Sequence, residues 1–196
     1  MFANRYTAFV DACTLAGTLK RNLLLTLAEA ELFRLRWSLL VLDETERAIE
    51  KILQGKDVVD ATERARRARA AMETAFEEAC VADFDDFLPA CANLPDPGDH
   101  HVLAAALKTQ AATIVTDNLK DFPEKVLATL DIEARSADDF IADTIALDTG
   151  RAVAAIRKMR ERFKKPEKTP GILLLDMEAE GLFETVDILR PHVGSL

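Results

Sequence analysis

The sequence predicts an α/β fold, with a parallel sheet flanked by helices and an all-helical C-terminal extension. Short apolar or β-branched runs alternate with stretches whose apolar residues recur at helical spacing. Such alternation is typical of a parallel sheet covered by helices. No strand pattern follows about residue 147. We therefore expect an α/β domain over residues 1–145 and a helical extension over residues 146–196.

The first part of the chain has a strand-then-helix pattern. Residues 7–10 form an apolar run that predicts a strand, and the leucines that follow recur at helical spacing. A second extended piece covers residues 33–37. Ser38 is a suitable N-cap for a helix that reaches about residue 53, and Gly55 is a suitable stop.

The middle of the chain begins with a second helix signal. Asp60 and Glu63 have the spacing of a capping box, which predicts a long helix through about residue 78. A short extended piece near residues 80–82 and a helix around residues 85–90 follow.

Proline and glycine mark the next boundaries. The turn at residues 95–98 precedes an alanine-rich helix at about 99–109. The remaining expected elements of this part are a strand at 113–116, a helix at 124–130, a strand at 132–134 and a helix capped by Ser136.

The C-terminal part combines helices with a concentration of positive charge. We expect a basic helix, a linker at residues 164–170, and helices at about 171–180 and 183–189. Eight basic and two acidic residues lie between 151 and 168, although the whole chain carries a net charge of -9. This arm could contact a phosphate backbone or form a solvated helix face. The candidate contacts are Arg157, Lys158, Arg160, Arg162 and Lys164.

Composition excludes several classes of protein. Apolar residues make up 49% and charged residues 30%, as in ordinary globular proteins. No apolar run approaches the ~20 residues of a membrane span, and residues 1–7 lack the apolar stretch of a signal peptide. We expect a cytoplasmic protein without a membrane partner. Three cysteines without Cys-x-x-Cys spacing support neither a zinc site nor a disulfide framework, so we expect reduced, mostly buried thiols.

Four acids lie either at the ends of predicted elements or within a helix that flanks the predicted sheet. Asp11 and Asp117 follow strands, Asp99 begins a helix, and Glu44 lies within a helix. The carboxyl ends of parallel strands meet at one edge of a sheet, so these side chains can converge. Carboxylates repel one another unless a cation lies among them, and oxygen ligands suit Mg²⁺ or Mn²⁺. The pattern predicts a metal site able to activate water for phosphodiester hydrolysis.

The segments around these acids resemble the successive motifs of the PIN-domain ribonucleases, most closely the branch of VapC-type toxins. The matching segments are residues 10–12, 36–44, 94–106 and 114–123. The resemblance covers about residues 7–141, and the tail at 171–189 is similar to the helical extension of some members. It implies a five-stranded parallel sheet, an endoribonuclease dependent on Mg²⁺ or Mn²⁺, an RNA substrate and a neutralising antitoxin.

The resemblance also assigns roles to individual residues. The family's three steadiest acids correspond to Asp11, Glu44 and Asp99. We favour Asp117 as the fourth acid, with Asn118 or Thr116 positioning water or phosphate. The residues expected to surround these acids are Cys13, Ser38, Asp96, Thr116 and Asn118.

Two positions depart from the family pattern. Cys13 replaces a frequent Ser or Asn, and His100 replaces a frequent Arg. Loss of such supporting contacts can weaken activity or metal affinity by about 10 to 100-fold. His100 and His101 are expected to pack or cap rather than bind the ion, because carboxylates already suit a hard cation.

Two other functions remain open at this stage. A PIN-like fold could hold a basic partner on its acidic face without turnover, since opposite charges associate selectively without chemistry. A metal-dependent nuclease acting on DNA is also compatible with the same acids. The sequence leaves the oligomeric state open, and a homodimer is one option.

Overall fold

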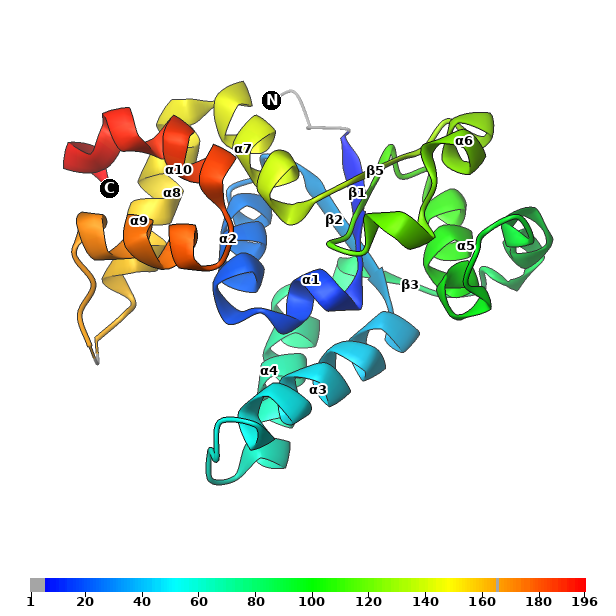
Figure 1. The fold of residues 1–196 in the computed structure, drawn as a ribbon, viewed down its shortest axis with the longest axis horizontal. Coiled ribbons are helices and arrows are strands. Elements are labelled where there is room, and N and C mark those ends of the chain that lie inside the picture. Colours follow the sequence, from blue (N-terminus) through cyan, green and yellow to red (C-terminus); the bar gives the residue numbers. More distant parts are fainter. Residues whose placement is uncertain (1–5, 165) are drawn as a thin grey trace. The chain divides into compact units, whose positions relative to one another are not determined.

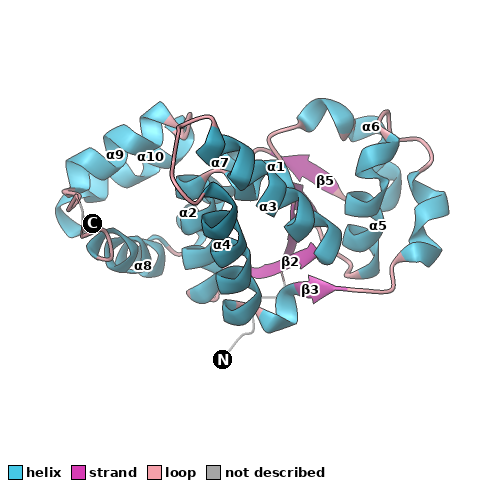
Figure 2. Ribbon diagram, turned by 90° about the horizontal axis from the view of Figure 1, so that it is seen from below, coloured by secondary structure: helices cyan, strands magenta, loops and turns pink. Residues whose placement is uncertain are grey.

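The computed structural model describes residues 6–164 and 166–196. It contains a five-stranded parallel sheet in the order β3-β2-β1-β4-β5, flanked by helices (Figure 1, Figure 2). The predicted fold class is therefore confirmed. The strands are β1 (Thr7–Val10), β2 (Arg34–Ser38), β3 (Cys80–Val81), β4 (Thr113–Val115) and β5 (Glu133–Arg135).

Ten α-helices and six short 3₁₀ segments are found in the described residues. No described helix has both the length and the apolar character that crossing a bilayer requires. The α-helices are α1 (Ala12–Ala16), α2 (Thr18–Glu29), α3 (Leu39–Gln54), α4 (Ala61–Ala75), α5 (His100–Lys108), α6 (Glu124–Leu127), α7 (Ala137–Leu147), α8 (Thr149–Glu161), α9 (Pro170–Ala179) and α10 (Phe183–Leu189). The 3₁₀ segments are η1 (Glu77–Ala79), η2 (Asp85–Cys91), η3 (Pro97–Asp99), η4 (Leu119–Asp121), η5 (Ala128–Leu130) and η6 (Arg190–Ser195).

The described residues divide into two compact units. The sheet unit comprises residues 6–17 and 35–135, and the helical unit comprises residues 18–34, 136–164 and 166–196. Almost the whole sheet, with α1 and α3 to α6, belongs to the first, whereas α2 and α7 to α10 belong to the second. The boundary expected after residue 145 stays a prediction.

Two interior strands of the sheet, β1 and β4, are buried on both faces. All four residues of β1 and all three of β4 are buried, which explains their continuous apolar and β-branched runs. The register pairs Ala8 with Thr113 and Val10 with Val115. The residues that follow each strand, Asp11 and Thr116, are therefore neighbours at one edge of the sheet.

Helix α3 begins and ends as its sequence predicts. The Ser38 hydroxyl accepts a hydrogen bond from the amide of Val41 at 3.2 Å, and Gly55 follows the helix as its C-cap. The helix packs with α4 as a hairpin (Figure 1). Arg67 and Arg69 of α4 form i,i+4 pairs with Glu63 and Glu73.

The capping box predicted at Asp60 is wrong. Asp60 has a φ of 61°, in the left-handed region, and its side chain makes no capping hydrogen bond. An N-cap side chain reaches the first amides from an extended backbone, which this residue lacks. The helix also ends at Ala75 rather than near residue 78.

Two other expectations need correction. The segment at residues 85–91 is a 3₁₀ turn with Pro89 inside it rather than an α-helix, because proline cannot supply an α-helical amide. Cys13 and Cys80 are exposed, and only Cys91 is buried. Cys13 lies in the first turn of α1 and Cys80 in the edge strand β3, so neither lies in the core.

The helical unit has its own apolar and polar contacts. Phe33 and Phe140 meet edge to face with ring centroids 4.9 Å apart. The Asp138 carboxylate accepts hydrogen bonds from the amides of Glu184 and Thr185 at 2.9 and 2.8 Å, and so satisfies the start of α10. The four expected C-terminal segments correspond to α8, the linker, α9 and α10. Lys165, which we counted in the basic arm, lies outside the described residues, as do residues 1–5.

The two helix starts can be compared by substitution. Ser38→Ala removes a buried capping hydroxyl and should lower the free energy of unfolding by about 1 kcal/mol. Asp60→Gly removes no capping bond and suits a positive φ, so it should change stability by less than about 0.5 kcal/mol. Chemical denaturation of both variants and the parent tests this. Equal losses in the two variants would contradict it.

Candidate metal centre

Asp11 is anchored at the edge of the sheet where β1 and β4 end. Its carboxylate accepts hydrogen bonds from the Thr116 hydroxyl at 2.8 Å, the Ala12 amide at 2.6 Å and the Cys13 thiol at 3.1 Å. Although the residue Cys13 is exposed, its thiol makes a partly buried hydrogen bond. Desolvation of the thiol, followed by the negative charge of Asp11, raises the pKa of Cys13 to about 11, so this thiol stays protonated and can donate. These three hydrogen bonds hold the Asp11 side chain in one orientation, and the residue is only 6% exposed.

Asp99 lies in an electrostatically unfavourable position. It ends η3 and directly precedes α5, and its Oδ2 atom is buried without a hydrogen-bond partner. Burial raises the pKa of Asp99 to about 6, and the negative charges of Asp11, Asp96 and Asp121 add to this effect, which His101 partly opposes. A buried, unpartnered carboxylate oxygen surrounded by negative charge is the arrangement that a bound cation would stabilise.

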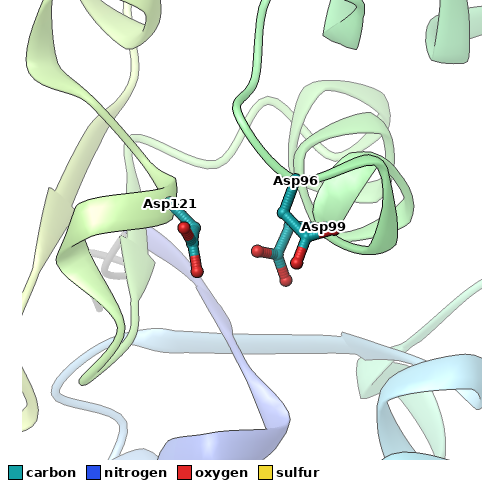
Figure 3. Close-up of side chains that lie close together, drawn as sticks. All are labelled: Asp96, Asp99 and Asp121. Carbon is teal, nitrogen blue, oxygen red and sulfur yellow. The ribbon is translucent and has the colours of Figure 1, made fainter.

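Three acids from two facing segments form a cluster. One ligand atom from each of Asp96, Asp99 and Asp121 lies within 4.8 Å of the others, the one such group found in the described part of the chain. Figure 3 shows the carboxylates of Asp96 and Asp99 on one side and that of Asp121 on the other. Asp96 accepts from the Gly98 amide at 2.8 Å, and a Cβ at Gly98 would lie 3.1 Å from that carboxylate oxygen. Glycine therefore suits this turn.

Asp117 is not among the three clustered acids, although the residues on either side of it take part in the network. Asp117 is exposed. Thr116 also accepts from the Asn118 amide at 3.1 Å, and the side-chain amide of Asn118 donates to Asp121. The network thus runs from Asp11 through Thr116 and Asn118 to Asp121.

Sequence reasoning did not single out Asp121. A signal was present, because Asp121 follows Asn118 by three residues within one turn, the spacing that places two side chains on one side. The role of the fourth acid was assigned instead to Asp117, which directly precedes Asn118.

Glu44 approaches the N-terminal part of α5. Its Oε1 lies 3.3 Å from Nε2 of His101, whose side chain is 13% exposed. The contact ties α3 to the helix that Asp99 precedes. Arg69 of α4 contacts Asp43 and Glu46, the acids close to Glu44 in sequence. The hairpin therefore neutralises its own charges beside Glu44.

The other candidate residues are distributed as follows. Ser38 caps the helix that carries Glu44 and makes no contact with the acidic cluster among the interactions described. The five basic candidates lie in the helical unit. Arg157 lies 3.0 Å from Glu161, and Arg160 donates to the Lys168 carbonyl at 2.7 Å. Lys158 and Arg162 line a groove between α2 and α8, and the backbone of Lys164 forms an isolated antiparallel β-bridge with that of Glu167.

Comparison with known proteins identifies the family. The sequence pattern described as PIN domain matches residues 7–120, and that described as VapC50 C-terminal domain matches residues 137–191. The chain belongs to the PIN-domain family. The resemblance expected from the motifs, including the helical extension, is confirmed.

One protein with a similar sequence is named as a ribonuclease. The protein called "Putative ribonuclease VapC50" from Mycobacterium tuberculosis (strain ATCC 25618 / H37Rv) is 42% identical over 76 residues. The match covers 39% of this chain and 45% of that protein, so it spans less than half of the relative's length. No solved structure matches the chain.

The donor set of this PIN domain fits a divalent cation. Every clustered ligand atom is a carboxylate oxygen, which hard ions such as Mg²⁺, Mn²⁺ and Ca²⁺ prefer to softer sulfur or nitrogen ligands. The orphaned Oδ2 of Asp99 supplies an unsatisfied lone pair at the same place.

The raised pKa of Asp99 predicts a pH effect on the metal-free protein. Between about pH 4 and pH 6 the folded state holds a proton that the unfolded state has lost, so this group's contribution to stability falls as pH rises through that window. Asp99→Asn should flatten this part of the profile and raise stability at pH 7. Thermal unfolding in EDTA from pH 4 to pH 7 measures it.

The matched control is Glu124→Gln, which removes one exposed carboxylate elsewhere in the sheet unit. It should leave the shape of the pH profile as in the parent. A parent profile that rises through pH 4–6, and that Asp99→Asn leaves unchanged, would contradict the electrostatic account of Asp99.

Proposed function

We propose that the chain is a metal-dependent endoribonuclease that hydrolyses RNA phosphodiester bonds and acts as the toxin of a type II toxin-antitoxin pair. The observation that carries the proposal is the buried, unpartnered Oδ2 atom of Asp99 among other acids, in a PIN domain. The name of the mycobacterial relative supports ribonuclease activity. We further propose that the protein works in the cytoplasm.

Several acids are available to hold the ion. From the sequence we propose Asp11, Glu44, Asp99 and Asp117, and from the geometry we add Asp121 and Asp96 as candidates. Bound Mg²⁺ or Mn²⁺ would polarise a phosphoryl oxygen and lower the pKa of a water molecule near the scissile bond. The carboxylates of this chain would bind and orient the ion.

The neighbouring polar residues have a supporting role in this proposal. Thr116 and Cys13 fix the Asp11 carboxylate, and Asn118 fixes Asp121. His101 orients Glu44 from the start of α5. Preorganised acids hold an ion better than mobile ones, because less conformational freedom is lost when the ion binds.

The proposed partners follow from the family. The C-terminal match and the mycobacterial relative both carry the VapC name, which supports a VapB-type antitoxin as the protein partner and RNA as the substrate. The basic residues of the helical unit would supply contacts to phosphates.

Removing a metal-holding acid should abolish cleavage without unfolding the protein. Asp11→Asn and Asp99→Asn should each lower the rate of RNA cleavage by at least about 100-fold, because the ion loses a charged ligand. EDTA should stop the parent enzyme, and added Mn²⁺ or Mg²⁺ should restore it. Cleavage of a labelled RNA and growth after expression of the chain alone are the measurements.

Glu124 lies outside the cluster, so the Glu124→Gln variant should cleave RNA at the parent rate. Full activity of Asp11→Asn would reject the proposed site. A parent protein that binds but never cleaves RNA with either ion would favour a binding module, and preferential cleavage of single-stranded DNA would favour a DNA nuclease.

The fourth acid can be assigned by a second pair of variants. Asp121 lies in the cluster and Asp117 is exposed, so Asp121→Asn should weaken Mn²⁺ binding by about tenfold or more, and Asp117→Asn by much less. Titration of Mn²⁺ by calorimetry on both variants tests this. A larger effect at Asp117 would restore the assignment based on the sequence.

A further inference from the structure

A groove lies between α2 and α8 within the helical unit. Its volume is about 420 Å³, and residues of both helices and of the turns that follow them line it. Ala154 and Ala155 of α8 contribute only methyl groups, which leaves room above the helix. Arg151, Lys158 and Arg162 line the same groove, with Glu29 as its only acidic lining residue.

The three basic residues lie on one face of α8 and its final turn. They are spaced by seven and four residues, a pattern that returns to the same side of a helix. At 1.5 Å per residue they are spread over about 16 Å along the helix axis. All three are exposed. They form a row of positive charge rather than a single point.

Existing ion pairs leave this row available to a ligand. Arg162 lies 3.4 Å from Glu29, and Arg151 lies 3.3 Å from Asp148. Lys158 makes no ion pair among the described residues. Exposed pairs of this kind contribute little to stability, so an incoming anion can replace the carboxylates.

The groove selects for charge and offers little apolar anchoring. Its lining side chains are basic residues, alanines, one threonine and one glutamate. A docked peptide would need pockets for large apolar or aromatic anchors, which this lining lacks. A phosphate backbone needs only positive charge and N–H donors, and arginine can bind a phosphate through two hydrogen bonds.

We propose that this groove binds the phosphate backbone of RNA through Arg151, Lys158 and Arg162, independently of base sequence. The inference rests on the proposed ribonuclease function and names a second RNA-binding site within it. It also changes the set of RNA contacts expected from the sequence. Arg151 joins that set because it lines the groove, whereas Arg157, Arg160 and Lys164 are not among the lining residues.

The test measures RNA binding separately from cleavage. A triple variant, Arg151→Gln/Lys158→Gln/Arg162→Gln, is compared with the parent in EDTA by fluorescence anisotropy of a labelled single-stranded RNA. Affinity should fall by at least about tenfold at low salt. The slope of log affinity against log salt should decrease by about 0.7 for each lost phosphate contact, because fewer counterions are released on binding.

A charge-matched control separates the groove from net charge. Lys51→Gln/Lys56→Gln/Lys125→Gln removes three exposed positive charges from the sheet unit, and should lower RNA affinity by less than about threefold. An equal loss in both triple variants would overturn the proposal in favour of diffuse attraction. Unchanged RNA affinity in the groove variant would also overturn the proposal. If the groove variant lost binding to polyglutamate but kept its affinity for RNA, the groove would be assigned to an acidic polypeptide.

Two further readouts keep the outcomes distinct. Circular dichroism verifies that each variant is folded. If the triple variant unfolds, the single Lys158→Glu substitution, which breaks no ion pair, replaces it. Lys158→Glu should also weaken RNA binding. A parent protein that binds RNA through the groove but never cleaves it with Mn²⁺ rejects the proposed function alone. Cleavage by the parent together with full RNA binding by the groove variants rejects the groove alone.

Discussion

The mutual repulsion of carboxylates around Asp99 is the interaction on which the candidate site depends. Parallel pairing of β1 with β4 brings Asp11 beside Thr116, and the turns after β4 and before α5 bring Asp121 toward Asp96 and Asp99. Burial and these neighbours raise the pKa of Asp99. The protein holds the acids together through hydrogen bonds from Thr116 and Asn118, and a cation would relieve the remaining cost.

The acidic cluster and the row of basic residues lie in different compact units. The sheet unit holds the acidic cluster, and the helical unit holds the row of basic residues along α8. A metal site needs converging negative charge, whereas a phosphate backbone needs spread positive charge.

Local sequence signals predicted most of the secondary structure. The strands β1 and β4 followed from continuous apolar and β-branched runs, and the caps at Ser38 and Ser136 followed from residue type and position. These signals work because they depend on residues within one turn or one strand. The capping box at Asp60 failed because its left-handed backbone is set by the chain reversal between α3 and α4, which residue spacing does not report.

The sequence by itself determined the order of the elements, the PIN-domain assignment and the expectation of an acidic site where β1 and β4 end. The tertiary structure alone decided that Asp121 joins Asp96 and Asp99, that Asp117 is exposed, and that Glu44 meets His101. It alone also formed the groove between α2 and α8. The physical reason is that residue type and spacing specify local backbone structure, whereas the direction of a side chain depends on packing between segments distant in the sequence.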